Sequence, residues 1–202
     1  MKTSPVFSRG QALWMMAVVF LWVSGCSANV ETKQQPVPDY LTAITVPSLR
    51  ALYPAFLAEA QKWDADADLE KVTIDLFQVS EELGEVSAIF HSPNRPMELF
   101  FVDYFLDDGT MVNDIIELDF PHRNFHFVRY EDLIDSTEAW QIFLQQPEVL
   151  AHAKEDFECA KLILIRNVDA TRLSWRLALG GLCGDTDLTF YYVDAYTGEF
   201  RK

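Results

Sequence analysis

The chain has 202 residues, with 16 lysines and arginines against 31 aspartates and glutamates, and a formal net charge of −15. A chain this acidic offers no cationic stripe for the phosphates of a nucleic acid or for electrostatic docking on anionic lipid, so its charge argues against both. Half of the residues are hydrophobic, which excludes a disordered chain and predicts one compact domain or two small ones.

Residues 1–25 have the pattern of a secretory signal peptide. Lys2 and Arg9 precede an unbroken apolar run over residues 12–23, which is shorter than the roughly 20 residues of a membrane-spanning helix. The run ends in Val-Ser-Gly followed by Cys26, and this sequence resembles the lipobox of bacterial lipoproteins. The alternative is an ordinary secretory signal with a chance cysteine.

The lipobox resemblance implies cleavage before Cys26 and acylation of that residue. Two or three acyl chains anchor a protein durably, since each buried CH₂ contributes roughly 0.8 kcal/mol. Ser27 in place of an aspartate implies export to the periplasmic face of the outer membrane. Residues 26–46 are polar and contain Pro36 and Pro38, so they are predicted to be a flexible tether. Cleavage would remove Lys2 and Arg9 and no acidic residue, leaving a net charge of −17.

The segment after the tether has the periodicity of a helix. Apolar residues recur at spacings of three and four and share one face: Leu49, Leu52, Tyr53, Phe56, Leu57, Ala60 and Trp63. Pro54 lies within this stretch and lacks the N–H that an α-helix uses. We therefore expect a kink there, or two short helices.

The pattern then changes to the alternation that is typical of β-strands. Two successive segments, separated by a turn at residues 81–84, alternate apolar and polar residues: Val72, Ile74 and Leu76, then Val86, Ala88 and Phe90. Residues 98–106 predict a third strand. Asp108-Gly109 is a hairpin signal, and residues 111–118 return as a fourth strand.

The second half of the chain repeats this order of elements. A helical stretch begins at Ser136 and is interrupted at Pro147, and strands are predicted at about residues 159–166, 173–182 and 188–194. Phe100–Asp103 matches Tyr191–Asp194 at an offset of 91 residues, and the segment from Pro54 to Ala60 matches that from Pro147 to Ala153 at an offset of 93. The same alignment matches Val72 with Ile163, Ile74 with Ile165, Val86 with Leu177 and Ala88 with Leu179. Short apolar matches also arise by chance, and an internal duplication is the favoured interpretation.

The end of the chain resembles a known family. It reads Tyr192-Val193-Asp194-Ala195-Tyr196-Thr197-Gly198-Glu199-Phe200, and Trp175 lies in the preceding strand. These features resemble the closing strand and turn of PepSY domains, and the resemblance covers about residues 136–202. Residues 47–119 resemble the family only through the internal repeat, because no Thr-Gly-Glu turn follows Asp103.

The resemblance implies an α+β protein of tandem cystatin-like, PepSY-like units, each a helix packed on a curled antiparallel β-meander. The first unit would span residues 47–119 and the second residues 136–202, with a connector at 120–135. PepSY domains occur in propeptides of thermolysin-type metallopeptidases and in bacterial envelope proteins. The implied function is non-catalytic protein binding or peptidase inhibition, with a peptidase or an envelope-assembly component as partner. No cofactor is predicted.

Five residues are candidates for a binding surface. The aromatic pairs Phe100-Phe101 and Tyr191-Tyr192 each place one ring on either face of a strand, and an acidic residue follows two positions later. We therefore single out Phe100, Asp103, Tyr191, Tyr192 and Asp194. One aromatic of each pair is expected in the core, and Asp194 is also placed to cap the Thr-Gly turn.

No metal site is predicted. Asp64, Asp66 and Asp68 resemble the start of a calcium-binding loop, but Leu69 stands where that loop needs glycine, so a polar helix-to-strand loop is favoured. His122 and His126 have the spacing of helical zinc ligands, yet the aromatic residues around them favour extended chain. In extended chain these two residues would lie roughly 13 Å apart.

Catalytic signatures are also absent from the sequence. It contains no nucleophile elbow, phosphate-binding loop or HExxH motif, and its four histidines lie in no recognisable arrangement with a nucleophile. Acidic residues are plentiful, so a hydrolase that uses surface carboxylates is the alternative to a binding protein.

The two remaining cysteines, Cys159 and Cys183, are predicted to form a disulfide. Export would place them in an oxidising compartment. If residues 159–166 and 173–182 form a hairpin, facing residues have numbers that sum to about 340, which brings these cysteines nearly opposite each other. The alternative is two free thiols.

Overall fold

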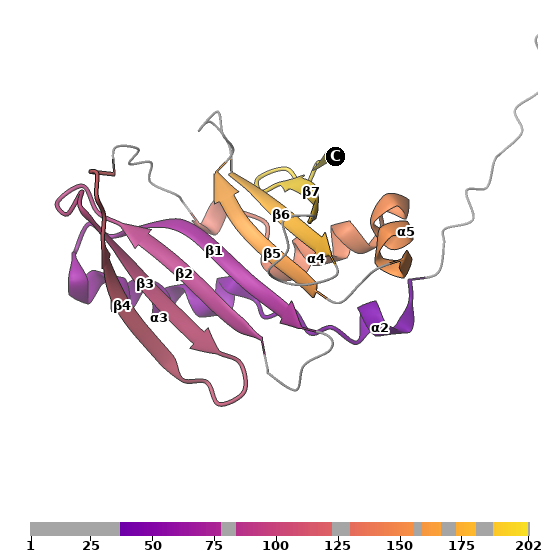
Figure 1. The fold of residues 1–202 in the computed structure, drawn as a ribbon, viewed down its shortest axis with the longest axis horizontal. Coiled ribbons are helices and arrows are strands. Elements are labelled where there is room, and N and C mark those ends of the chain that lie inside the picture. Colours follow the sequence, from indigo (N-terminus) through magenta and orange to yellow (C-terminus); the bar gives the residue numbers. More distant parts are fainter. Residues whose placement is uncertain are drawn as a thin grey trace, which may run out of the picture. The chain divides into compact units, whose positions relative to one another are not determined.

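Eight strands pair in one antiparallel sheet, in the spatial order β4-β3-β2-β1-β5-β6-β7-β8 (Figure 1). The computed structural model describes residues 37–77, 84–122, 130–155, 159–166, 173–180 and 188–201. The strands are β1 Asp68–Phe77, β2 Glu85–His91, β3 Glu98–Phe105, β4 Met111–Glu117, β5 Cys159–Arg166, β6 Leu173–Gly180, β7 Thr189–Asp194 and β8 Phe200–Arg201. The strands predicted from alternation are therefore confirmed.

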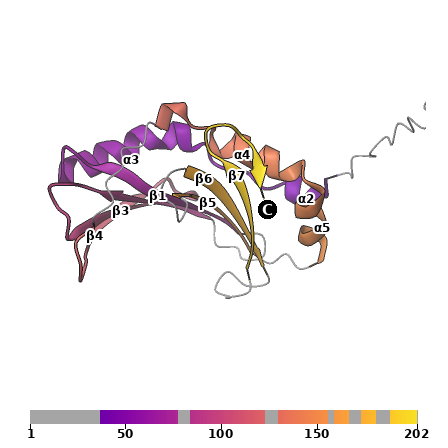
Figure 2. The same cartoon turned by 90° about the horizontal axis from the view of Figure 1, so that it is seen from above.

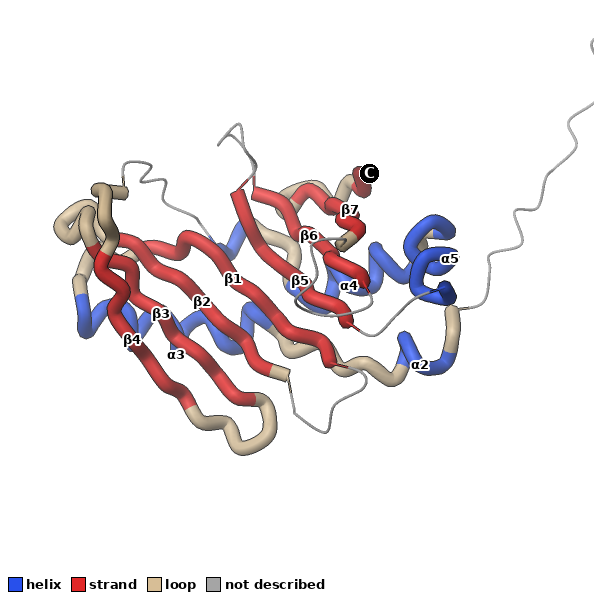
Figure 3. Tube along the Cα trace, in the orientation of Figure 1, coloured by secondary structure: helices blue, strands red, loops and turns tan. Residues whose placement is uncertain are grey.

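Helices lie along one face of the sheet (Figures 2 and 3). They are α2 Asp39–Thr42, α3 Leu49–Trp63, α4 Ser136–Leu144 and α5 Pro147–Glu155, with a 3₁₀ turn η1 at Tyr130–Asp132. Helix α3 packs on β1 and β3, and α4 packs on β6 and β7. Each half of the sheet thus has its own helix, in the repeated order that the sequence predicts.

The two four-stranded meanders are joined edge to edge. Strand β1 pairs with β5 in antiparallel fashion, with Val72 opposite Leu164 and Thr73 opposite Ile163. This pairing gives hydrogen-bond partners to two strands that would otherwise be exposed edges. Residues 35–202 consequently cluster as one compact unit.

The α+β class is confirmed. The strands form one shared sheet, whereas the sequence predicts a pair of curled meanders. The eight strands belong to one continuous sheet that is neither closed nor strongly curled. Two separate curled units would each need to wrap their own helix, whereas the shared sheet lets α3 and α4 pack on the same face (Figure 2).

Helix α3 runs through Pro54 as one helix, so of the two expected outcomes, a kink or two short helices, the second is wrong. Phe56 and Ala60 are fully buried on the sheet side of the helix, and their packing outweighs the one backbone hydrogen bond that Pro54 cannot make. The equivalent proline of the second half, Pro147, is instead the first residue of α5 and separates it from α4.

The predicted alignment of β1 with β5 in the internal repeat is wrong by one residue. Val72 is fully buried toward the helices and faces Leu164, so Leu162 and Leu164 occupy the corresponding inward positions of β5. Ile163 pairs with Thr73 and points to the opposite face, because successive residues of a strand alternate between faces. The match of Val72 with Ile163 therefore places the two residues on opposite faces.

The β5–β6 register is close to the predicted one. Cys159 lies opposite Gly180 and Arg166 opposite Leu173, so facing residues sum to 339 instead of about 340. Cys183 lies outside the described residues, as does the turn between these strands. The disulfide between Cys159 and Cys183 stays a prediction.

The N-termini of α3 and α4 meet at Asp135 and Ser136. The Asp135 carboxylate accepts hydrogen bonds from the backbone N–H of Arg50 at 2.9 Å and from the Tyr130 hydroxyl at 3.1 Å. Ser136 Oγ accepts from the N–H of Leu49 at 2.8 Å. Residues from the start of the second half thus satisfy N–H groups at the first turn of α3, which would otherwise lack partners.

Candidate functional site

Exposed apolar side chains concentrate on β3, β4 and the loops beside them. Of the large hydrophobic side chains that are exposed in the described part of the chain, all but Tyr196 lie between residues 97 and 120. We call this set the β3–β4 patch: Met97, Phe105, Val112, Ile115, Ile116 and Phe120. Phe120 is 81% exposed and Val112 is 50% exposed. These side chains lie on both faces of the strand pair, since Ile115 is opposite Phe100 on the helix face and Val112 is opposite Asp103 on the other face. They therefore flank the β4 edge from both sides.

Strand β4 is also a free edge of the sheet. The Phe105 N–H donates to the Thr110 carbonyl and the Leu118 N–H donates to the Met97 carbonyl. Opposed residues of an antiparallel pair alternate between hydrogen-bonded and non-bonded pairs. With this register, the N–H and C=O groups of Val112, Asp114 and Ile116 point toward β3 and bond to it. The N–H and C=O groups of Met111, Asn113, Ile115 and Glu117 therefore point away from β3, toward the side where no described strand pairs, and the Ile115 N–H donates there to the Asp114 carboxylate at 2.8 Å.

The five predicted binding residues fall in different environments. Phe100 and Tyr191 are 5% and 3% exposed, and both belong to the core under the helices. The Tyr191 hydroxyl donates to the Glu148 carbonyl at 3.3 Å, which ties β7 to α5. Asp103 and Tyr192 alternate with these positions, lie partly exposed on the face without helices, and are separated by four intervening strands. The structure thus does not bring the five together.

Asp194 has the turn-capping position that the sequence predicts. Its Oδ1 accepts hydrogen bonds from the N–H groups of Tyr196 and Thr197, each at 3.0 Å, and the residue is 4% exposed. Gly198 has φ of +72°, a conformation that glycine adopts without strain. The turn therefore needs no function to explain these residues.

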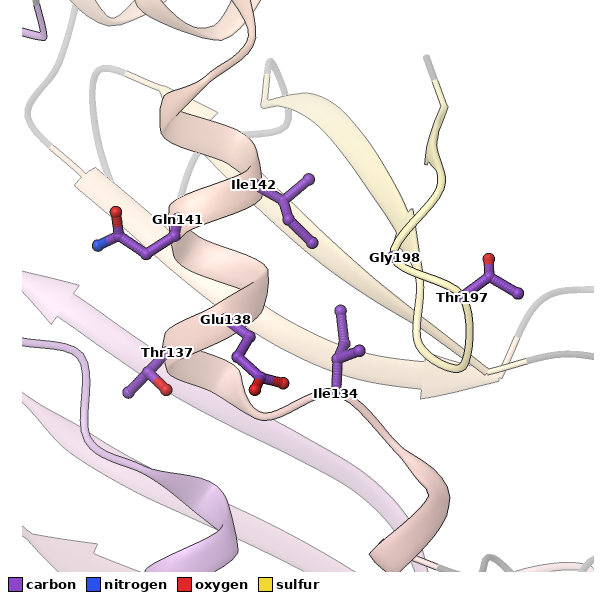
Figure 4. A pocket seen from close by; sticks show the side chains of 7 residues that line it. All are labelled: Ile134, Thr137, Glu138, Gln141, Ile142, Thr197 and Gly198. Carbon is purple, nitrogen blue, oxygen red and sulfur yellow. The ribbon is translucent and has the colours of Figure 1, made fainter.

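A pocket lies between this turn and α4 (Figure 4). Ile134 and Ile142 face Thr197 and Gly198 across it. Its volume of about 650 Å³ is in the range of ligand pockets. Glu138 is the charged residue of the lining, and its Oε2 already accepts the Asp135 N–H at 2.9 Å as part of a capping box. The pocket thus contains no free cluster of convergent polar groups.

Three carboxylates lie on neighbouring strands of the face without helices. Burial raises the pKa of Glu85, and the charges of Asp75 and Asp103 raise it further. Lys161 opposes this effect and pairs with Asp75 at 3.1 Å. Of the three, Asp103 is the one that the sequence analysis had singled out.

Glu70, His91 and His122 form a second polar cluster, at the end of the sheet where β2 ends. Glu70 Oε2 lies 3.0 Å from His91 Nδ1 and 3.3 Å from His122 Nε2. The two imidazole rings have centroids 5.2 Å apart. Burial raises the pKa of the Glu70 carboxyl, but the His91 hydrogen bond and the charges of both histidines outweigh it and hold the pKa below its usual range.

This cluster differs from the histidine pair considered in the sequence. His122 approaches Glu70 and His91, whereas His126 lies outside the described residues. Glu70 and His91 are missed by sequence reasoning, because no spacing motif links three residues that come from separate segments.

The acidic loop after α3 follows the favoured interpretation of a polar connection. Asp64 Oδ1 accepts the N–H of Asp66 at 2.9 Å, and the Asn94 amide donates to both carboxylates. Arg95 Nε lies 3.6 Å from Asp64 Oδ2. These protein groups satisfy the carboxylates of Asp64 and Asp66.

Comparisons with known proteins give no match: no protein-family model, no curated protein and no solved structure is similar to the chain at a significant level. Among the described residues, no helix is both long enough and apolar enough to cross a membrane. The function therefore has to be inferred from the geometry and the sequence.

Proposed function

We propose that the protein binds an extended segment of a partner protein along the edge of β4. The observation that carries this proposal is the coincidence of two features on one strand. β4 has outward-pointing N–H and C=O groups, and its neighbourhood contains nearly all of the exposed large apolar side chains of the described residues. Edge hydrogen bonds give affinity in strand addition, and alternate side chains give specificity.

The chemistry of β4 favours a different protein over a second copy of the chain. An antiparallel pairing of two β4 strands over their full length would place Asp114 directly opposite Asp114. Like charges in that position destabilise a strand pair. Asp107, Asp108, Asp114, Glu117 and Asp119 also surround the edge with negative charge, so the partner segment should combine apolar residues with lysine or arginine.

The cellular setting and the finer fold are part of the same proposal. Acylation of Cys26, which lies outside the described residues, would hold the protein at the periplasmic face of the outer membrane and raise its effective concentration for a partner there. The two helix-and-meander halves and the capped turn at Asp194 support two PepSY-like units that share one sheet. A peptidase or an envelope-assembly component is the class of partner that this resemblance implies.

Substituting Asn113 by proline should abolish partner binding. Asn113 has an outward-pointing N–H, so proline removes a bond to the partner while the β3–β4 ladder keeps its own bonds. With a photo-crosslinking side chain at Ile116 in cells, we expect the crosslinked product to fall at least tenfold in Asn113→Pro and to be unchanged in Asn113→Ala.

Two controls make this test specific to the edge. Asp114→Pro removes an inward hydrogen bond to β3, so it should also lower stability, whereas Asn113→Pro should leave the circular dichroism spectrum intact. A crosslinker at Tyr196, which is 45% exposed but lies at the β7–β8 turn, should not capture the same product. Equal crosslinking in Asn113→Pro and in the unsubstituted protein would refute strand addition at β4.

The raised pKa of Glu85 favours a hydrolase as the second candidate. A carboxyl group with a raised pKa is better suited to act as a general acid, and Asp103 on the neighbouring strand would be the second carboxylate. We expect no turnover of ester, glycoside, phosphate or peptide substrates above background. Turnover that disappears in Glu85→Gln and in Asp103→Asn, but persists in Asn113→Pro, would replace the binding function by a catalytic one.

A further inference from the structure

The Glu70, His91 and His122 cluster is assembled from three separate segments. Glu70 lies in β1 at an irregularity of the β1–β2 register between Leu69 and Lys71. His91 is the last residue of β2, and His122 lies in the loop that follows β4. A bulge re-aims a side chain relative to regular alternation, and bulges are common beside functional sites.

The backbone holds these side chains in place. His91 is 1% exposed, so its imidazole is enclosed by neighbouring side chains. The His122 N–H donates to the carbonyl of Pro96, and the Leu118 N–H donates to that of Met97. The loop carrying His122 is thus fixed along residues 96–97. A cluster on fixed backbone is suited to a ligand that needs defined geometry.

We propose that Glu70, His91 and His122 bind a divalent transition-metal ion, with Zn²⁺ as the best fit. All three residues offer a ligand atom, and these atoms lie within 4.8 Å of one another. Ligands about 2.0–2.1 Å from a tetrahedral zinc ion are separated from each other by roughly 3.3 Å. The separations of 3.0 and 3.3 Å from Glu70 Oε2 to the two imidazoles are near that value. The whole set of ligand atoms spans up to 4.8 Å, so the two imidazole nitrogens would move closer together on binding the ion.

The donor set selects the class of metal. Two imidazole nitrogens and one carboxylate oxygen suit Zn²⁺ and its transition-metal neighbours, whereas Mg²⁺ and Ca²⁺ prefer oxygen ligands alone. Three protein ligands leave a fourth coordination position. The side chains of Glu70 and His122 are 31% and 21% exposed, so that position is within reach of solvent. This proposal stands on its own observations and does not depend on strand addition at β4.

The same contacts have a metal-free explanation, in which Glu70 simply accepts hydrogen bonds from the two imidazoles. The two explanations differ in a direct measurement. A metal site takes up one ion per chain in competition with a chelator of moderate affinity, and all three side chains contribute to it. A structural ion-pair cluster takes up none.

The test uses the full chain purified in detergent, stripped with a chelator and titrated with Zn²⁺ by calorimetry. We expect one ion per chain, and a loss of affinity of at least tenfold in Glu70→Gln and in His122→Gln. His152→Gln is the matched control, because His152 lies beside Tyr191 and contacts no member of the cluster. Its affinity should equal that of the unsubstituted protein.

The melting temperature gives a second readout on the same two variants. His91→Ala is liable to unfold the chain, so binding is judged on Glu70→Gln and His122→Gln, whose folding is checked by circular dichroism. Zn²⁺ should raise the melting temperature of the unsubstituted protein and of His152→Gln, but not of those two variants. If the unsubstituted protein bound no stoichiometric Zn²⁺, or if Glu70→Gln and His122→Gln bound it as tightly as the unsubstituted protein, the ion-pair cluster would replace the metal site.

Discussion

Replacing Trp175 by alanine should lower the free energy of unfolding by about 3–5 kcal/mol, as is usual for a large buried aromatic side chain. Trp175 lies in β6 between Leu164 of β5 and Val193 of β7, and it is fully buried. Its Nε1–H donates to the Ile134 carbonyl at 3.0 Å, and the Ile134 N–H donates to the Ala195 carbonyl. The indole therefore joins the sheet to the segment that leads into α4.

Urea unfolding followed by circular dichroism would measure this loss, and two further variants separate its causes. Trp175→Phe retains much of the packing but leaves the Ile134 carbonyl without its donor, which should cost about 1–3 kcal/mol. Tyr192→Ala removes a partly exposed ring from the other face of the sheet and should cost less than about 1 kcal/mol. If Tyr192→Ala were as destabilising as Trp175→Ala, the assignment of the core to the helix face would be wrong.

The strands could be predicted wherever one face of the sheet is buried and the other is not. Val72, Ile74 and Leu76 alternate with polar residues and all three are buried toward the helices. In β5 the sequence Leu162-Ile163-Leu164 is apolar on both faces. Alternation therefore could not assign its register, and a shift of one residue reverses the face of every side chain.

The joining of the two halves could not be predicted from local patterns. Pairing of β1 with β5 brings together residues about 90 positions apart, such as Val72 and Leu164. Each meander has two candidate edges with apolar character, and nothing in the periodicity distinguishes the edge that pairs from the edge that stays open. The choice is made by tertiary packing, since it allows α3 and α4 to lie on one face (Figure 2).

The candidate sites differ in how far they could be predicted from the sequence. β4 was predicted as a strand over residues 111–118, but its position at the edge follows only from the order of the sheet. Glu70 depends on a local irregularity of β1, and His122 reaches the end of β2 only because the loop after β4 bonds to residues 96–97. Asp135 carried a signal that was available: an aspartate followed three residues later by Glu138 is the pattern of a capping box.

Asp135→Ala should destabilise the protein by about 2–4 kcal/mol, because it leaves several donors without an acceptor at once. The carboxylate accepts from the Arg50 N–H, the Tyr130 hydroxyl and the Thr137 hydroxyl at 2.9, 3.1 and 3.0 Å. It lies at the N-termini of both α3 and α4, where the helix dipoles favour a negative charge. Asp135→Asn retains one acceptor oxygen and should cost less than the alanine variant.

The stabilisation by Asp135 should depend on pH in a defined direction. Burial raises the pKa of its carboxyl, but hydrogen bonds from Ser48, the Arg50 backbone, Thr137 and Tyr130 outweigh burial and hold the pKa below its usual range. A lowered folded-state pKa means that the contribution is complete above the unfolded value of about 3.9 and is lost as pH falls through the folded value. The carboxylate is then protonated in both states.

Urea unfolding at pH 7, 5, 4 and 3 would measure this dependence. The difference in free energy of unfolding between the unsubstituted protein and Asp135→Asn should be constant from pH 7 to 5 and should shrink below about pH 4. Asp132→Asn removes an exposed carboxylate three residues away and controls for the change in net charge. A difference that stays constant down to pH 3 would mean that Asp135 acts through the shape of its side chain, because the same hydrogen bonds would then form without the charge.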